Sequence, residues 1–203
     1  MHLVILVEEP SAEEALSLLI PKIVGDKASF DIHSFGDKQT LLREIGSRLK
    51  AYAQWMPADW RIVVLVDRDD DDCLKLKGKL ELAAKDASLP SKTVASRKDR
   101  IRVINRIAVE ELEAWFFGDV QALTTAYPKV SSNLIKKAAY RDSDAIKGGT
   151  WEALERVLQK EGYFMTGLRK KELARTIAAA MRPERNTSHS FCAFRDAIIQ
   201  LVS

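Results

Sequence analysis

Apolar and polar residues alternate along the first half of the chain in two different patterns. Short apolar or alternating runs predict four strands, at residues 3–7, 29–35, 62–66 and 101–109. Between them, apolar residues spaced three or four apart predict helices from Pro10, from about residue 38 to Trp55, and over about 74–87. Strands that alternate with helices favour an α/β fold with a mostly parallel sheet flanked by helices.

The pattern changes after about Gly118, where short helical segments and turn signals replace the strand–helix alternation. We therefore expect an α/β domain over residues 1–118 and a basic α-helical extension over residues 119–203 that packs on it. Residues 186–191 predict a turn that caps a last helix at 191–202. The four tryptophans, which lie near apolar stripes, are expected in the core.

Charge is unevenly distributed along the 203 residues, although the net charge is only +3. Residues 1–90 carry 12 Lys and Arg against 16 Asp and Glu, a net charge of −4, which leaves +7 for residues 91–203. An acidic first half beside a basic second half suits a metal-centred site with a phosphate-binding surface. Two solvent-exposed surfaces whose charges differ by chance would give the same two net charges.

Cysteine content and hydropathy predict a cytoplasmic protein. Cys73 and Cys192 lie far apart and suggest no disulfide framework. The apolar run at residues 3–7 is far too short for a signal sequence or a membrane span, so no membrane association is expected.

Carboxylates follow three of the four predicted strands. Glu8 and Glu9 follow the first, five acids occupy the six positions from Asp67 to Asp72 after the third, and further acids follow the fourth. Because parallel strands end at one edge of a sheet, these acids should gather there. Carboxylates about 4 Å apart repel by roughly 4 kcal/mol near a protein surface unless they share a cation. The pattern predicts a Mg²⁺ site.

Other acidic motifs match less well. An EF-hand loop that starts at Asp67 would need Gly at its sixth position and Glu at its twelfth, where this chain has Asp72 and Gly78. A haloacid-dehalogenase phosphatase also has Asp-x-Asp after a strand, but usually after the first strand. A receiver domain has paired acids after its first strand and an Asp after its third, yet clear Thr/Ser and Lys partners on later strands are missing here.

A Glu after the first strand with Asp-x-Asp after the third resembles a known family. Residues 7–14 (VEEPSAEE) together with residues 66–69 (VDRD) are similar to the Toprim domain of topoisomerases, primases and overcoming-lysogenization-defect nucleases. Toprim proteins usually have Gly where this chain has Glu9. The segments 106–115, 149–154 and 186–191 extend the resemblance to small bacterial Toprim-like proteins of unknown function, often encoded beside ATPases or in restriction and defence loci.

The resemblance implies a Toprim-like, Rossmann-like sheet and a metal-dependent nuclease that cleaves phosphodiesters of DNA or RNA. Mg²⁺, with Mn²⁺ as a substitute, would be the cofactor. The implied catalytic residues are Glu8, Asp67 and Asp69, and the implied metal ligands are Glu8, Asp67, Asp69, Glu110 and Glu113. Glu110 and Glu113, one helical turn apart, would share a helical face and complete a second metal site. An acidic helix N-terminus favoured by the helix dipole explains these residues equally well.

Basic residues of the second half are the expected contacts to a nucleic-acid backbone. They are Lys136, Lys137, Arg169, Lys170 and Lys171. By resemblance, the chain would be the effector of an anti-phage defence pair controlled by a partner ATPase. The alternative is a non-catalytic, metal-binding regulatory subunit of an ATPase-containing complex. An oligomer is compatible with either.

Overall fold

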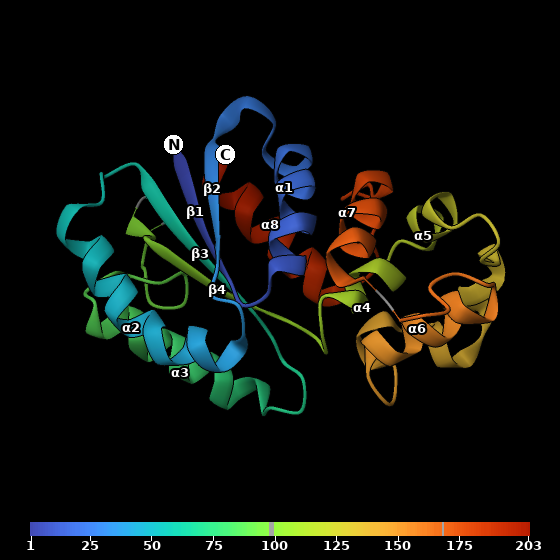
Figure 1. Cartoon of the computed structure of the whole chain (residues 1–203). Coiled ribbons are helices and arrows are strands. Elements are labelled where there is room, and N and C mark those ends of the chain that lie inside the picture. Colours follow the sequence, from blue (N-terminus) through green and yellow to red (C-terminus); the bar gives the residue numbers. More distant parts are fainter. Residues whose placement is uncertain (98–99, 168) are drawn as a thin grey trace.

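The centre of the protein is a sheet of four parallel strands. The computed structural model describes residues 1–97, 100–167 and 169–203. The strands are β1 (His2–Val7), β2 (Ser29–Ser34), β3 (Trp60–Asp67) and β4 (Val103–Ala108), hydrogen-bonded in the order β2-β1-β3-β4 (Figure 1). In the register, Val7 lies opposite both Ser34 and Leu65, so β1 and β2 end at one level, and β3 continues two residues further to Asp67, which lies opposite Ala108 of β4. The predicted α/β fold with a parallel sheet is confirmed.

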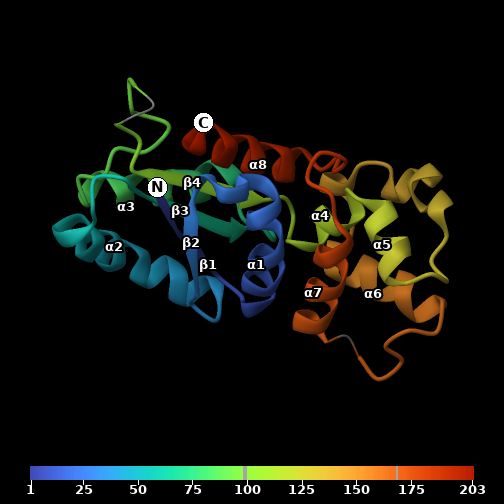
Figure 2. The ribbon, with the colours of Figure 1, turned by 90° about the horizontal axis from the view of Figure 1, so that it is seen from above.

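Helices cover both faces of the sheet. They are α1 (Pro10–Val24), α2 (Lys38–Trp55), α3 (Cys73–Asp86), α4 (Glu113–Phe117), α5 (Val120–Ala126), α6 (Thr150–Lys160), α7 (Lys170–Ala180) and α8 (His189–Val202). Short 3₁₀ helices lie at η1 (Gly25–Lys27), η3 (Ser132–Lys136), η4 (Ala138–Tyr140) and η5 (Ser143–Ala145). Figure 2 shows α2 and α3 on one side of the strands and α8 on the other.

The alternation of side chains along the strands explains the two layers. Leu3, Ile5 and Val7 belong to the apolar cluster of α1 and α8, whereas Val4 and Leu6 belong to that of α2 and α3. Strands buried on both faces have almost continuous apolar sequences, as β1 and β3 do.

Residues after 118 form a helical lobe beside the sheet and then return to it. Helix α7 packs against α1, α5 packs against α7, and α4 packs against α6 (Figure 1). Helix α8 then lies against β4, where Arg106 Nε donates to the Ala193 carbonyl at 3.1 Å. One apolar cluster runs from β1 and β3 through α4 into α5, α6 and α7.

Two details differ from the prediction. Helix α4 begins only at Glu113, so Glu110 lies outside it and the two residues share no helical face. Trp115 is fully buried as expected, but Trp55 is 58% exposed, and Trp60 and Trp151 are only partly buried. The last helix begins close to the predicted position, with Ser188 as its N-cap. None of the helices in the described ranges has both the length and the apolar character needed to cross a membrane.

The strand order places a topological switch point at the carboxyl end of the sheet, between β1 and β3. After β1 the chain moves to β2 on one side, and later to β3 on the other side of β1. The loops that follow β1 and β3 therefore separate at this point. In open α/β sheets, ligands bind at such topological switch points.

Candidate functional site

Two carboxylates occupy the switch point. Glu8 directly follows β1 and is only 5% exposed, and Asp67 is the last residue of β3 and partly buried. The Asp67 backbone N–H donates to Glu8 Oε2 at 3.2 Å, which ties the two strand ends together. Asp69 follows two residues later, exposed, in a left-handed conformation (φ 48°) that aspartate tolerates better than most residues.

Glu113 brings a third low-exposure carboxylate to the same place. It is the first residue of α4, is 4% exposed, and raises the pKa of Asp67 by its charge. Burial first, and then the charges of Glu8 and Glu113, hold the pKa of Asp67 well above its usual value. Burial also raises the pKa of Glu8 to about 7 and that of Glu113 to about 8. Glu8 and Glu113 are therefore close enough to Asp67 to disfavour its ionisation.

Lys38 balances the outer acids of this edge. It is the first residue of α2, and its Nζ donates to the Arg68 carbonyl at 2.8 Å and pairs with Asp69 Oδ2 at 3.0 Å and Asp71 Oδ2 at 2.6 Å. The sequence analysis missed this residue. The signal was available, because Lys38 comes soon after β2, whose end lies at the same edge of the sheet.

Lys170 approaches the acids from the helical lobe. It is the first residue of α7, its Nζ lies 3.2 Å from Glu9 Oε2, and it sits 4.7 Å from the ring centroid of Trp151. Burial opposes its charge, but Glu9 and Glu113 outweigh that effect and raise the pKa of Lys170. A cation held over an aromatic face and beside carboxylates remains charged at neutral pH.

The remaining acids after β4 have other partners. Arg68 Nη2 pairs with Glu110 Oε1 at 2.6 Å, so this predicted metal ligand is engaged by a guanidinium. Glu111 accepts from the backbone N–H of Trp151 at 2.8 Å and from the Thr150 hydroxyl at 2.9 Å, and thereby caps α6. Of the acids that follow β4 in the described ranges, Glu113 alone lies close enough to Asp67 to raise its pKa.

The other predicted nucleic-acid contacts lie apart from the carboxylates. Lys136, Lys137 and Lys171 are exposed, and Arg169 pairs with Glu172 at 3.3 Å. Because neighbouring helical residues point in directions about 100° apart, one member of the run 169–171 reaches the acids and the other two face elsewhere. The roles of the four as phosphate contacts stay predictions.

The donor set suits a hard divalent cation. Glu8, Asp67 and Glu113 offer oxygen ligands at low exposure, and Asp67 forms no ion pair with any residue that the structure describes. Mg²⁺ needs only one or two carboxylates and keeps its own waters. As placed, however, no three His, Cys, Asp or Glu side chains within residues 1–97, 100–167 and 169–203 are arranged around a common metal position. These residues therefore suit a divalent cation by the type of their ligand atoms and by their low exposure, and not by their present arrangement.

Removing the buried charge of Glu113 should stabilise the protein at high pH. A carboxyl whose pKa is raised by folding, here from 4.5 to about 8, contributes stability at low pH that is lost as pH rises through that range. Glu113→Gln should raise the free energy of unfolding by about 1–3 kcal/mol at pH 9 and change it little at pH 4.5. Urea unfolding at both pH values, with exposed Glu184→Gln as the control, checks this; equal effects at both pH values would contradict it.

Comparison with known proteins identifies the family of this chain. The family model described as a domain of unknown function (DUF4276) matches residues 7–199 of the 203. Neither the curated proteins nor the solved structures contain a match. The matched range includes the ends of β1 and β3, Glu113 and Lys170. The chain therefore belongs to the DUF4276 family.

Proposed function

We propose that this protein is a Toprim-like, Mg²⁺-dependent nuclease that cleaves phosphodiester bonds of DNA or RNA. One observation carries the proposal: Glu8 and Asp67 are in hydrogen-bond contact at the topological switch point, and the buried Glu113 lies close enough to raise the pKa of Asp67. Buried carboxylates that repel one another are costly for the fold. A divalent cation among them would offset that cost and create a site for phosphate.

The proposed roles are those of metal ligand and proton carrier, and Glu8 is a candidate for both. Asp67 and Asp69 would hold Mg²⁺, with Glu8 and Glu113 completing the site, whereas Glu110 would first have to leave Arg68. The ion, when bound, would neutralise phosphoryl oxygens and acidify an attacking water. Glu8, with a pKa of about 7, is suited to accept or return a proton at neutral pH.

Two cations at the rim would position the polymer. Lys38 and Lys170 lie on α2 and α7, on two sides of the acids, and each holds a carboxylate that a substrate phosphate could replace. Trp151 beneath Lys170 offers a partly exposed aromatic surface for a base. Lys136, Lys137, Arg169 and Lys171 would extend the contact along the backbone.

A cleavage assay tests the proposal. The full chain is incubated with Mg²⁺ or Mn²⁺ and a mixture of labelled single- and double-stranded DNA and RNA. We expect metal-dependent cutting that EDTA abolishes, and the polymer that is cut identifies the substrate class. Metal binding without cutting would favour the second candidate, a non-catalytic regulatory subunit of an ATPase-containing complex. That candidate and the anti-phage role come from the family resemblance, whereas the proposed cytoplasmic location comes from the cysteine content and the hydropathy.

Lys170 and Lys171 form a matched pair for the substrate contact. Lys170→Gln should lower kcat/KM for cleavage about 10- to 100-fold, because a hydrogen bond between a charged, partly buried lysine and a phosphate is worth roughly 1.5–3 kcal/mol. Lys171→Gln removes the same charge from the exposed neighbouring position and should change kcat/KM about threefold or less. Both variants are measured over a series of salt concentrations. Equal losses would show that Lys170 acts only through net charge.

A further inference from the structure

The outer side of α3 presents apolar side chains to solvent. Leu74, Gly78 and Leu82 lie one turn apart along the helix, on the side opposite the residues that pack on the sheet, which are Leu76, Leu80 and Ala84. Leu74 is 84% exposed and Leu82 is 56% exposed. Single exposed leucines are ordinary, but two in one stripe on a helix that already buries its opposite face are not explained by the fold.

Two hollows meet at Leu82. One, of about 280 Å³, lies between α2 and α3 and is lined by Leu42, Gly46 and Ala83. The other, of about 590 Å³, lies between α3 and the segment after it and is lined by Leu89 and Val94, which is 71% exposed. The stripe and the two hollows form one surface, called here the α3 face: Leu42, Gly46, Leu74, Gly78, Leu82 and Val94.

Two glycines of this surface are not needed by the chain itself. Gly46 and Gly78 lie inside α2 and α3, and neither has a positive φ. A Cβ built on either would meet nothing within 4 Å. Glycine inside a helix lowers its stability relative to alanine, and its use is to let another backbone come close. Both glycines lie where an incoming helix would need that room.

The charges around the α3 face select the kind of partner. Lys50 and Lys79 line the smaller hollow and Lys85 the larger one, and none of the three forms an ion pair with a residue in the described ranges. Among the residues that line the smaller hollow, Asp86 is the single carboxylate. A second copy that docked through its own α3 face would bring lysines against lysines, whereas an acidic partner would neutralise them.

We propose that the α3 face docks an acidic amphipathic helix of a partner protein. Its apolar stripe would lie over Gly78 between Leu74 and Leu82 and extend into the hollows beside Leu82. Its Asp and Glu residues would flank that stripe and pair with Lys50, Lys79 and Lys85. This is the helix-in-groove mode of recognition, with apolar anchors for affinity and charge for orientation. The inference does not depend on the nuclease chemistry.

A designed peptide tests the chemistry of the partner. The probe is a fluorescein-labelled helix of about 18 residues, five turns long, with a leucine stripe and glutamates elsewhere. Its binding to the full chain is followed by fluorescence anisotropy, beside a scrambled peptide and one with lysine in place of glutamate. We expect the acidic helix to bind at least tenfold more tightly than either. Leu82→Asp should weaken binding at least tenfold, and Met165→Asp, at a site 70% exposed outside the α3 face, should leave it unchanged.

Gly78 provides a test that separates docking from stability. Gly78→Ala should raise Tm by about 1–4 °C, because alanine favours the helix. Gly78→Leu should keep the fold and weaken the acidic helix at least tenfold by filling the space above α3. Binding that ignores both Leu82→Asp and Gly78→Leu would overturn the proposal. If sedimentation shows a dimer that Leu82→Asp abolishes, the partner at the α3 face is a second copy of the chain and the proposal is wrong. If a DNA oligonucleotide displaces the peptide, the partner is nucleic acid and the proposal is wrong as well.

Discussion

Asp67→Asn should abolish metal-dependent cleavage without harming the fold. We expect a loss in kcat of about 10³-fold or more, the order seen when one member of a catalytic unit is removed. The reason is the position of Asp67, which ends β3 at the switch point, contacts Glu8 through its backbone and has no cationic partner among the described residues. Steady-state cleavage at saturating Mg²⁺ measures the effect.

The thermal stability of the variant distinguishes a lost ligand from a damaged fold. Asparagine keeps the size of the side chain and removes the carboxyl group of Asp67. Burial and two neighbouring acids raise the pKa of that group, because they disfavour its charged form. Asp67→Asn should therefore melt at the same temperature as the wild type or higher at pH 8. Asp70→Asn, an exposed change three residues away, serves as the control and should retain cleavage. A fully active Asp67→Asn would remove the basis of the proposed chemistry.

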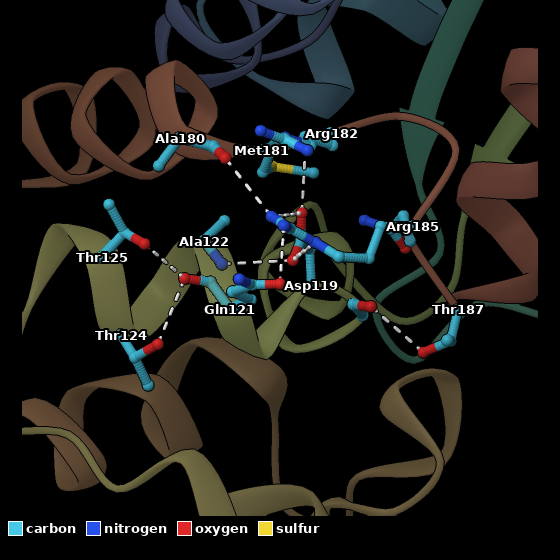
Figure 3. Close-up of polar contacts among 12 residues, drawn as sticks. Asp119, Gln121, Ala122, Thr124, Thr125, Ala180, Met181, Arg182, Arg185 and Thr187 are labelled. Carbon is cyan, nitrogen blue, oxygen red and sulfur yellow. Dashed lines mark hydrogen bonds and ion pairs between the residues drawn. The ribbon is translucent and has the colours of Figure 1, made fainter.

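Asp119→Ala should cause the largest loss of stability among single changes at buried charges. Asp119 is the N-cap of α5, and its side chain is fully buried. It accepts hydrogen bonds from the Ala122 and Arg182 backbone N–H groups at 3.1 and 3.0 Å, and from two guanidinium nitrogens of Arg185 at 2.8 and 2.9 Å (Figure 3). Arg185 is 29% exposed, but Asp119→Ala also leaves two backbone N–H groups without an acceptor, so we expect a total loss of about 3–5 kcal/mol.

Thermal unfolding measures this effect. For a chain of this size, a loss of 3–5 kcal/mol lowers Tm by roughly 10 °C. Asp37→Ala is the matched control, because Asp37 also caps a helix, accepting from Thr40 at 2.8 Å, but is exposed; it should cost about 1 kcal/mol. The double variant Asp119→Ala/Arg185→Ala should lose less than the sum of its two single changes. Equal losses for Asp119→Ala and Asp37→Ala would show that the buried pair adds nothing beyond the cap.

The sheet could be predicted from the sequence because its signals are local. Continuous apolar runs such as 62–66 occur where a strand is covered on both faces, and a proline suits the first turn of a helix, as Pro10 does in α1. Acids at the ends of β1 and β3 could be placed at one edge because parallel strands share direction. For the same reason, Glu8 and Asp67 could be expected to lie together before their contact was observed.

The partners of the charged side chains could not be predicted in this way. Whether Glu110 faces a metal or Arg68 depends on where α4 begins, and helix boundaries vary by a few residues in sequence-based prediction. Glu111 caps α6, a helix 39 residues further along the chain, which no local pattern indicates. Lys38, in contrast, could have been predicted as a site residue, because it follows β2 closely and the end of β2 lies at the same edge as those of β1 and β3.

Direct binding of Mn²⁺ tests the central claim, that the carboxylates at the ends of β1 and β3 hold a divalent cation. Electron paramagnetic resonance measures free Mn²⁺ as it is titrated with the wild type, Asp67→Asn, Glu8→Gln and the control Asp70→Asn. We predict saturable binding to the wild type and to the control, competition by Mg²⁺, and at least tenfold weaker binding to Asp67→Asn and Glu8→Gln. Equal binding by all four proteins, or no binding by the wild type, would contradict a metal site at the switch point.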